Sequence, residues 1–296
     1  MPEPGDSPRF DLSQARIAIL GLGLMGGSLA YALAGKCAAL LGVDPDPRAR
    51  QLASASGIFS EVRPQATALS SPVEVWVLAA PARAILAILD EMPAWSGRGG
   101  IVLDLGSTKV QITAAMQELP ARYDPLGGHP MCGKETGSFA SADGGIFHGA
   151  PFALCRLERS SLRAIGFAVA LCNALNADPV WLPAEVHDRQ VAATSHLPYL
   201  VANALAASTP LDAAPLVGPG FRSAARLAGS PPEMMLDILL TNRAQILDAA
   251  RRFQAAFGSL VSALEDPGDP GNADLRERLQ SGRQKRSDLL RLEEQL

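Results

Sequence analysis

The chain has 296 residues, of which 48% are hydrophobic and 19% are charged. This composition is too apolar for a disordered chain, and the length is sufficient for two domains. A formal net charge of -4 gives no electrostatic reason to expect nucleic acid or an anionic membrane as a partner.

The beginning of the chain has no basic region followed by an apolar one, so no signal peptide is expected there. No apolar stretch reaches the roughly 20 residues that a membrane-spanning helix needs. The four cysteines form no CxxC pair and lack the spacing of a metal site. These features predict a cytoplasmic protein with reduced thiols and without a bound metal.

Residues 1–14 are rich in Pro, Gly and charge, and we expect a flexible leader there. From Arg16 onward, short apolar runs alternate with helical stretches rich in Ala and Leu. The runs expected to form strands are Arg16–Leu20, Ala39–Val43, Val73–Ala79, Ile101–Leu105, Pro151–Arg156 and Pro179–Leu182. Apolar strands between helices indicate a parallel sheet covered on both faces. We therefore predict an α/β Rossmann-like, doubly wound domain over residues 15–183.

After Pro183 the strand signals stop, and an all-helical dimerisation domain is expected over residues 184–296. Apolar residues at helical spacing predict helices over Ala184–Ala207 and Pro232–Leu264, and a charged helix over Ala273–Gln295. The segment Val191–Ala214 has more apolar face than one small domain can bury. A homodimer whose helices interlock is therefore expected.

A glycine-rich motif, GLGLMG, lies between the first strand and a helix expected over Gly27–Ala34. The first glycine permits a tight turn, the second lets a pyrophosphate approach the backbone, and the third allows close helix–strand packing. Asp44 ends the second strand, where a carboxylate binds a ribose 2′-hydroxyl and favours NAD over NADP. The residues expected to bind the cofactor NAD are Gly21, Gly23, Leu24, Met25, Gly26 and Asp44.

Two alternatives remain open for this motif. A glycine-rich turn also occurs in α/β proteins that bind no cofactor. Asp44 can instead form a turn or cap a helix, and Arg48 and Arg50, which lie close by, could weaken the exclusion of NADP.

Further segments resemble the prephenate/arogenate (cyclohexadienyl) dehydrogenase family in order and spacing, from about residue 16 to beyond 240. They are the DLGSTK segment at 104–109, GGHPMCG at 127–133, the pair His187-Asp188, SHLP at 195–198, and the stretch 220–228 from GFR to RLA. The resemblance implies NAD-dependent oxidative decarboxylation of prephenate to 4-hydroxyphenylpyruvate in tyrosine biosynthesis. Arogenate or an amino-deoxyprephenate remain alternative substrates.

The resemblance assigns two catalytic residues. His129, expected in a loop just past a Gly-Gly turn, is the acceptor near the substrate hydroxyl, because imidazole titrates near neutral pH. Ser107 donates a hydrogen bond to the substrate or to His129; alternatively it caps the helix that starts near Lys109. Lys109 itself lies either near the site or on a solvated face.

The resemblance also implies a set of substrate-binding residues. An arginine suits a carboxylate because its guanidinium binds in a bidentate way and stays charged. Those residues are His196, Tyr199, Arg226, Ser223 and Arg222, with Arg222 the weaker arginine. His196 could alternatively be a core residue.

This chain departs from the family at two of these positions. Tyr199 replaces a histidine and Ser223 replaces an acidic residue that many members have. The choice between prephenate and arogenate therefore stays open. The pair His187-Asp188 is either a structural hydrogen-bonded pair or part of the cleft, and His148 matches no motif.

Two other protein classes share some of these features. β-Hydroxyacid dehydrogenases resemble this chain in their GLGxMG start and helical second domain, but they carry a catalytic lysine there, and none of Lys36, Lys109, Lys134 and Lys285 lies in the expected stretch. A non-catalytic NAD-binding sensor explains the glycine motif but not the joint presence of Ser107, His129 and Arg226.

Overall fold

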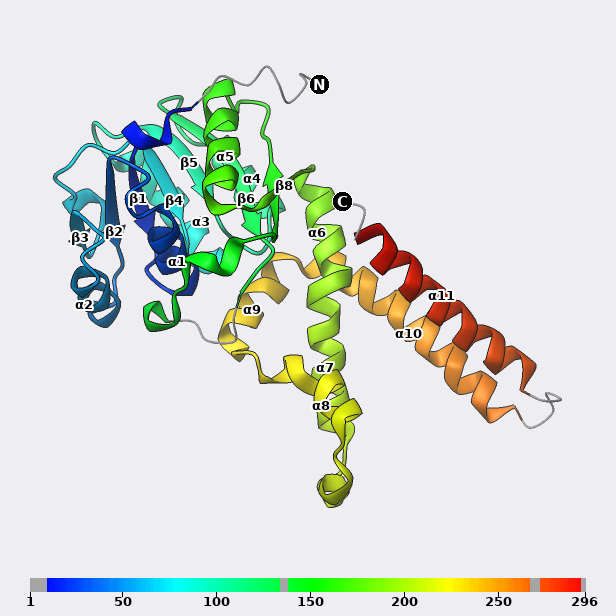
Figure 1. Cartoon of the computed structure of the whole chain (residues 1–296). Helices are drawn as coiled ribbons and strands as arrows, with labels where there is room; N and C mark the ends of the chain where they lie inside the picture. Colours follow the sequence, from blue (N-terminus) through cyan, green and yellow to red (C-terminus); the bar gives the residue numbers. More distant parts are fainter. Residues whose placement is uncertain (1–9, 134–137, 267–271, 294–296) are drawn as a thin grey trace. The chain divides into compact units, whose positions relative to one another are not determined.

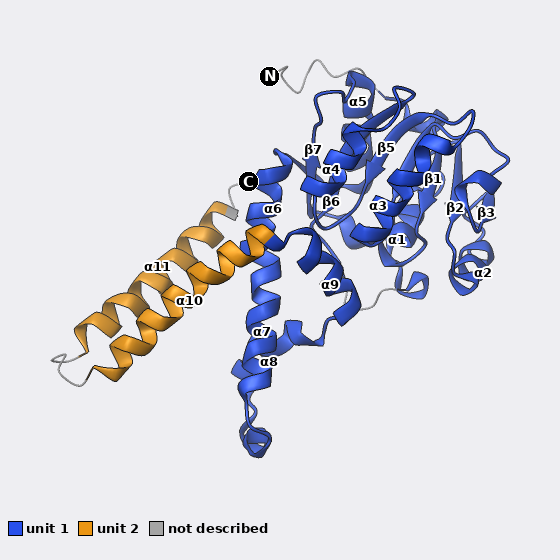
Figure 2. Ribbon diagram, turned by 180° about the vertical axis from the view of Figure 1, so that it is seen from behind, with its two compact units in different colours: residues 1–243 blue, residues 244–296 orange. Residues whose placement is uncertain are grey.

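The computed structural model describes residues 10–133, 138–266 and 272–293. The chain divides between Arg243 and Ala244 into two compact units, which are coloured separately in Figure 2. The first unit holds the sheet and the helices up to α9, and the second is a pair of long helices. The predicted domain boundary after residue 183 remains a prediction.

The first unit is built on an eight-stranded sheet within the described residues (Figure 1). Its order is β3-β2-β1-β4-β5-β6-β7-β8, and every neighbouring pair is parallel except β6 and β7. The strands are β1 (Arg16–Leu20), β2 (Ala39–Val43), β3 (Glu61–Arg63), β4 (Val75–Leu78), β5 (Gly100–Asp104), β6 (Tyr123–Pro130), β7 (Pro151–Cys155) and β8 (Asp178–Trp181).

Helices cover both faces of this sheet. Ile17 and Ile19 of β1 belong to one apolar core with α1 and α5, whereas Ala18 and Leu20 belong to another with α3 and α4. The helices between the strands are α1 (Leu24–Leu33), α2 (Pro47–Ala55), α3 (Ala82–Glu91), α4 (Val110–Gln117) and α5 (Leu162–Leu175). This alternation confirms the predicted doubly wound architecture.

Strand β6 was not predicted from the sequence because of its glycines. Gly127 and Gly128 were interpreted as a turn that places His129 in a loop; this was wrong, because all three lie within β6. A Cβ atom on Gly128 would lie 2.8 Å from the carbonyl oxygen of Asp104. Glycine is thus required here by close packing against β5, not by a turn conformation.

The beginning of the chain is packed where it is described. Leu12–Gln14 forms a short 3-10 helix that Asp11 caps, and the rings of Phe10 and Phe167 meet edge to face with centroids 5.2 Å apart. Residues 1–9 of the predicted leader lie outside the described residues.

The helical part of the first unit starts with α6 (Ala184–Val191) and α7 (Leu197–Ser208), which are joined by a π-helical turn over Ala192–His196. The later helices are α8 (Pro219–Ala225) and α9 (Pro232–Thr241). The sequence predicted one helix over 232–264. Asn242 interrupts it with φ -120° and ψ 26°, so that α9 ends there.

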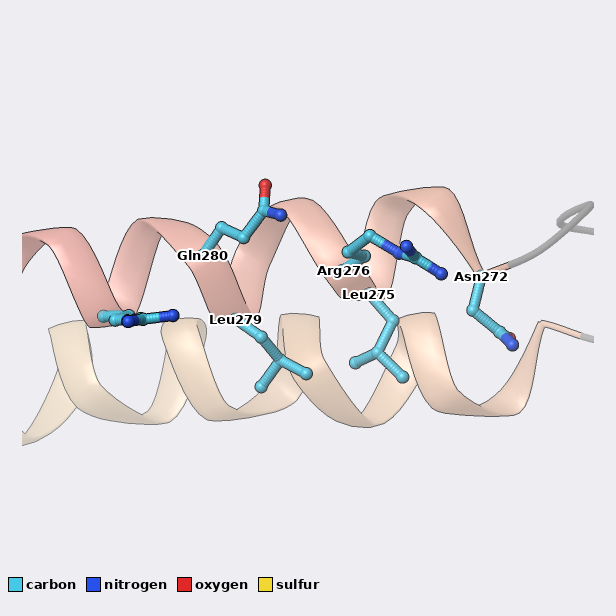
Figure 3. A pocket seen from close by; sticks show the side chains of 6 residues that line it. Asn272, Leu275, Arg276, Leu279 and Gln280 are labelled. Carbon is cyan, nitrogen blue, oxygen red and sulfur yellow. The ribbon is translucent and has the colours of Figure 1, made fainter.

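The second unit consists of α10 (Arg243–Glu265) and α11 (Ala273–Glu293), which run side by side as a hairpin (Figures 1 and 2). Figure 3 shows Leu275 and Leu279 of α11 pointing toward the ribbon of α10, in a shallow pocket lined only by residues between 272 and 283. Among the described residues, no helix is long and apolar enough to cross a membrane.

Candidate active site

The glycine motif forms the turn between β1 and α1. Gly21 has φ +99°, and a Cβ atom on it would lie 2.4 Å from the carbonyl oxygen of Ala79. Gly23 is the N-cap of α1 and has no side chain to satisfy the first amide groups. Helix α1 begins at Leu24, three residues earlier than predicted, so Met25 and Gly26 lie in its first turn. The N–H groups of this turn form an anion site of the kind that binds a pyrophosphate.

The third glycine lets the helix approach the turn. A Cβ atom on Gly26 would lie 1.9 Å from the carbonyl oxygen of Gly21, which no side chain could tolerate. Gly27 is equally confined, because a Cβ atom there would meet Ala142 and Phe139. These close approaches pack the glycines of the turn tightly against the neighbouring backbone and side chains.

Asp44 is half-buried and held next to this turn. Its carboxylate accepts hydrogen bonds from the backbone N–H of Leu22 (2.7 Å) and of Asp46 (2.8 Å). The bond to Leu22 ties the carboxylate to the glycine motif. The bond to Asp46 shows that Asp44 also shapes the turn after β2. Arg50 donates to the carbonyl oxygens of Asp44 and Pro45 and so contacts backbone there.

A buried ion pair joins the ends of β5 and β6. The ammonium group of Lys109, fully buried, donates to the carboxylate of Asp104 and, at 2.6 Å, to the carbonyl oxygen of Gly128. The solvated alternative for Lys109 was therefore wrong. Asp104 in turn accepts from the backbone N–H of Gly106 (2.9 Å) and of Gly128 (3.2 Å). One carboxylate thus holds the residues that directly precede Ser107 and His129.

His129 stands at the head of a hydrogen-bonded chain. Its Nδ1 lies 2.9 Å from Nε2 of His187, and Nδ1 of His187 lies 2.8 Å from a carboxylate oxygen of Asp188. His187 and Asp188 belong to α6 and are each 1% exposed. The predicted hydrogen bond between His187 and Asp188 is therefore confirmed, and the pair also contacts the predicted catalytic histidine; its place in the cleft stays a prediction.

Asp188 also caps helix α4. Its two carboxylate oxygens accept from the backbone N–H of Lys109 (2.7 Å) and of Val110 (2.9 Å). A carboxylate at this position is favourable because the N-terminus of a helix carries a partial positive charge. The alternative role of Ser107 as the cap was thus wrong. Ser107 is half-buried in the loop between β5 and α4.

A second histidine is linked to the same residue. The side-chain amide nitrogen of Asn242 donates to the main-chain carbonyl oxygen of Asp188 at 2.7 Å and lies 3.3 Å from Nδ1 of His196. His196 is 2% exposed at the end of the π-helical turn. Thr241, next to Asn242, accepts from the hydroxyl of Thr108 at 2.9 Å. Helix α9 is thereby joined to the loop that carries Ser107.

Burial makes both histidines weak bases. Desolvation, assisted by the positive charge of the Lys109 ammonium group, lowers the pKa of His129 well below its ordinary value. Desolvation also lowers the pKa of His196 to about 4, opposed by Asp188 and assisted by His187. His129 is therefore neutral at neutral pH, which is the state in which an imidazole can accept a proton.

The other predicted substrate residues lie apart from this chain of contacts. Arg222 and Ser223 are exposed on α8, and Arg226 is exposed on a short 3-10 helix that packs beside α7. Tyr199 is 9% exposed and packs in an apolar cluster with Leu227, the neighbour of Arg226. The substrate roles of these residues, and of His196, remain predictions. His148 is exposed.

The sequence did not point to Asn242, since an asparagine between two helical stretches carries no signal beyond that of a helix end. Asp104 and Asp188 lay inside motifs that were noticed, but their bonds join residues far apart in the chain. Among the described residues, no group of His, Cys, Asp or Glu could hold a metal ion. The cysteines, all within the described residues, are free.

Comparisons with known proteins agree on one family. The model for the nucleotide-binding domain of prephenate dehydrogenase matches residues 29–180, and the model for its dimerization domain matches residues 183–281. Prephenate dehydrogenase of Bacillus subtilis (strain 168) is 33% identical over 245 residues, 78% of this chain and 65% of that protein. The chain thus spans just under two thirds of that relative.

Two further relatives differ in name. Cyclohexadienyl dehydrogenase of Zymomonas mobilis is 26% identical over 257 residues, 84% of this chain and 88% of that protein. A crystal structure of Aquifex aeolicus prephenate dehydrogenase, in complex with hydroxyphenyl propionate and NAD+, has a TM-score of 0.85, 26% identity, and covers 95% of this chain and 100% of that one. The fold, the two matched domains and these relatives show that the chain belongs to the prephenate dehydrogenase family.

Proposed function

We propose that this chain is an NAD-dependent dehydrogenase that oxidises and decarboxylates prephenate to 4-hydroxyphenylpyruvate, a step of tyrosine biosynthesis. The observation that carries the proposal is the chain of contacts from His129 through His187 to Asp188, beside the Ser107 loop. This chain uses Nδ1 of His129, so Nε2 is the ring nitrogen left to meet a substrate hydroxyl. The site lies at the carboxyl ends of β5 and β6, where ligands of open α/β sheets bind.

The proposed cofactor fits the residues around the glycine motif. Gly21 and Gly26 allow the turn to pack closely against its neighbours, and the amide groups that start α1 would bind the oxygens of a pyrophosphate. Asp44 would accept a hydrogen bond from a ribose hydroxyl and repel a 2′-phosphate, which favours NAD over NADP. NAD, when bound, supplies the hydride acceptor.

The reaction balances without net proton release. Prephenate loses a hydride from C4 and its ring carboxylate as carbon dioxide, and the electron pair of the broken C–C bond makes the ring aromatic. The products are 4-hydroxyphenylpyruvate, carbon dioxide and NADH. His129 accepts the hydrogen bond, and transiently the proton, of the 4-hydroxyl as the C4–O bond gains double-bond character, and it returns the proton to the phenol oxygen.

We further propose that Ser107 donates a hydrogen bond to the substrate and that Arg226 binds a substrate carboxylate, with Arg222 as a second cation. His196 would line the substrate pocket. These roles rest on the family to which the chain belongs and on the charge and placement of the residues. Tyr199 and Ser223 would border the substrate side chain, where prephenate carries a pyruvyl group and arogenate an alanyl group.

We also propose a homodimer, with the second unit at its interface. Large apolar side chains of this hairpin are exposed in the single chain: Leu264 is 73% and Phe257 57% exposed, and Leu279 and Leu289 are more than half exposed. Such a surface is typical of a subunit interface. The match of residues 183–281 to a dimerization domain supports this proposal.

Production of NADH tests the function. The full chain is assayed with prephenate, arogenate and an amino-deoxyprephenate, each with NAD and with NADP. We expect turnover of prephenate with NAD. A higher kcat/KM with arogenate, the alternative that the cyclohexadienyl dehydrogenase relative raises, would transfer the proposal to that substrate. NAD binding without turnover of any of the three would favour a sensor.

The carboxylate role of Arg226 has its own test. Replacing Arg226 by Ala should raise the substrate KM by roughly tenfold or more with a smaller change in kcat, because it removes binding that ground and transition states share. Arg222→Ala is the matched comparison, and a smaller effect is expected there. An unchanged KM in Arg226→Ala would remove this residue from the carboxylate site.

A further inference from the structure

Asp188 uses both its side chain and its main chain in buried hydrogen bonds, and each leads to a different histidine. Its carboxylate contacts His187, which contacts His129, whereas its carbonyl oxygen accepts from Asn242, which contacts His196. We propose that Asp188 is a positioning residue that fixes opposite tautomers in His129 and His196, making the first a hydrogen-bond acceptor and the second a donor toward the substrate.

The hydrogen bonds of the Asp188 carboxylate determine the tautomer of His129. The carboxylate of Asp188 already accepts two backbone N–H groups at the start of α4 and can only accept. Nδ1 of His187 must therefore carry a proton and donate it across 2.8 Å. When Nδ1 holds the only proton of the His187 ring, Nε2 has a lone pair, and Nδ1 of His129, 2.9 Å away, is the donor to it. The proton of neutral His129 is thus on Nδ1, and its Nε2 can accept.

The hydrogen bond to the main-chain carbonyl oxygen of Asp188 determines the tautomer of His196. The carbonyl oxygen of Asp188 can only accept, so the group of Asn242 that lies 2.7 Å from it is the amide NH2. The same nitrogen has a second hydrogen, and Nδ1 of His196 lies 3.3 Å away. Since this NH2 group can only donate, Nδ1 of His196 must accept. The proton of neutral His196 is thus on Nε2, where it can donate.

The two tautomers suit two different tasks. A neutral ring with Nε2 unprotonated can take the proton of a hydroxyl, whereas a neutral ring with Nε2–H can donate to a carboxylate or carbonyl oxygen. Burial keeps both rings neutral, because desolvation lowers the pKa of each. If His187 were instead a cation, its Nε2–H would donate to His129 and move the proton of His129 to Nε2, which abolishes the acceptor.

Nitrogen NMR of the full chain measures these tautomers directly. The chain has four histidines, so long-range proton–nitrogen spectra of histidine-labelled protein at neutral pH hold four ring patterns, which single substitutions assign. We expect the proton on Nδ1 in His129 and His187 and on Nε2 in His196. Free histidine prefers Nε2–H, so the first two patterns are diagnostic. A proton on Nε2 of His129, or on Nδ1 of His196, would overturn the proposal.

Substitutions test whether Asp188 is the cause. Asp188→Asn can present an NH2 group to His187 and so reverse the tautomers of His187 and His129. In a protease triad, the equivalent change lowers kcat about 10⁴-fold through the wrong tautomer; here we expect a kcat loss of roughly 10²–10⁴ and a matching change in the His129 spectrum. A loss of activity with an unchanged His129 pattern would contradict the role proposed for the Asp188 carboxylate.

A separate variant tests the link from the Asp188 carbonyl oxygen through Asn242 to His196. Asn242→Leu keeps the volume but removes both donors, so the fixed pattern of His196 should give way to exchange between tautomers while that of His129 persists, and the substrate KM should rise roughly tenfold. His148→Gln, at an exposed position outside the site, is the control and should leave the other three patterns unchanged.

The catalytic consequences rest on the proposed function, but the spectra do not. They are recorded without substrate, so the tautomers can be wrong in an active dehydrogenase, or correct in a chain that turns over nothing. If Asp188→Asn does not fold, the wild-type spectrum alone still decides the tautomers of His129 and His196.

Discussion

The site around His129 and the helical hairpin of the second unit differ in which kinds of side chain they bury and expose. In the site, charged and polar side chains are buried, and among the described residues no buried side-chain nitrogen or oxygen lacks a hydrogen-bond partner. In the hairpin, large apolar side chains such as Phe257 and Leu264 are exposed. The hydrogen-bonded network of the site therefore lies within one unit, whereas the hairpin exposes an apolar surface.

The two regions differ in their physical requirements. Burying a polar group costs free energy unless a partner is supplied, so a site such as this one depends on every member of its network. Exposing apolar area costs roughly 25 cal/mol per Å², a cost that association removes. Changes in the site should therefore act on chemistry and folding, and changes in the hairpin should act on assembly.

The largest effect is expected from His129→Asn. Asparagine keeps a polar side chain but cannot accept a proton at neutral pH, so kcat should fall by roughly 10²–10⁴. NAD affinity, measured by titration, should stay within about twofold, because the glycine motif is untouched. A kcat within tenfold of that of the wild type would exclude a catalytic role for His129. It would also contradict the expectation that changes in the site act on chemistry.

The next effect concerns the free energy of unfolding. Lys109→Met leaves the carboxylate of Asp104 buried without its ammonium partner, which should lower stability by about 3–5 kcal/mol in urea unfolding. Lys285→Met, at an exposed position on α11, is the control and should change stability by less than about 0.5 kcal/mol. Equal effects at the two lysines would contradict the structural role of the buried pair.

A somewhat smaller effect should follow from pH. The pKa of His196 is lowered from 6.5 to about 4 by burial. Between these values the unfolded chain binds a proton that the folded chain does not, so stability should fall as pH decreases from 6.5 to 4 and stop falling below that, by about 3 kcal/mol from this group. His129, whose pKa is also lowered, acts in the same direction.

The variant His196→Gln isolates this contribution. Its free energy of unfolding, measured across the same pH range, should fall less steeply than that of the wild type. His148→Gln should keep the wild-type slope, since that ring is exposed. Parallel slopes in all three proteins would show that His196 is not buried as a neutral group.

The smallest effect is expected in the hairpin. Leu264→Ser removes an exposed apolar side chain and should weaken a dimer by about 1.5–3 kcal/mol, a rise in Kd of at least roughly tenfold. Light scattering across a dilution series measures this. Gln254→Ser on α10 is the polar control, and a monomeric wild type at micromolar concentration would refute the dimer itself.

Most of the strands that the sequence predicted are buried along almost their whole length; β8 is the exception, because all of its residues are exposed. Continuous apolar runs marked β1 and β2 to the residue and β4, β5, β7 and β8 to within two. Strand β3 has three residues, too few to give a pattern. Strand β6 carries two prolines and two glycines, and what makes it a strand lies elsewhere: it pairs with β5 and β7, and Lys109 and Asp104 hold Gly128 in place.

The candidate site divides in the same way. His129, Ser107 and the glycine motif were predicted because local segments resemble a family. Most of the bonds that connect the site were not predictable, because they join residues far apart in the chain, such as Asn242 with His196 (46 positions) and Asp188 with Lys109 (79 positions). A single sequence carries no record of which distant residues meet, so Asn242 looked like an ordinary helix end.

The π-helical turn Ala192–His196 holds a consequence for any change in chain length near the site. Each residue of an α-helix advances the rotation by about 100°, and the wider turn inserts additional chain between α6 and α7. Deleting one residue there would restore ordinary α-helical periodicity and turn α7 by about that angle against α6. Asp188 and His196 would then no longer share Asn242. The rotation of α7 relative to α6 thus keeps His129 and His196 in one network through Asp188.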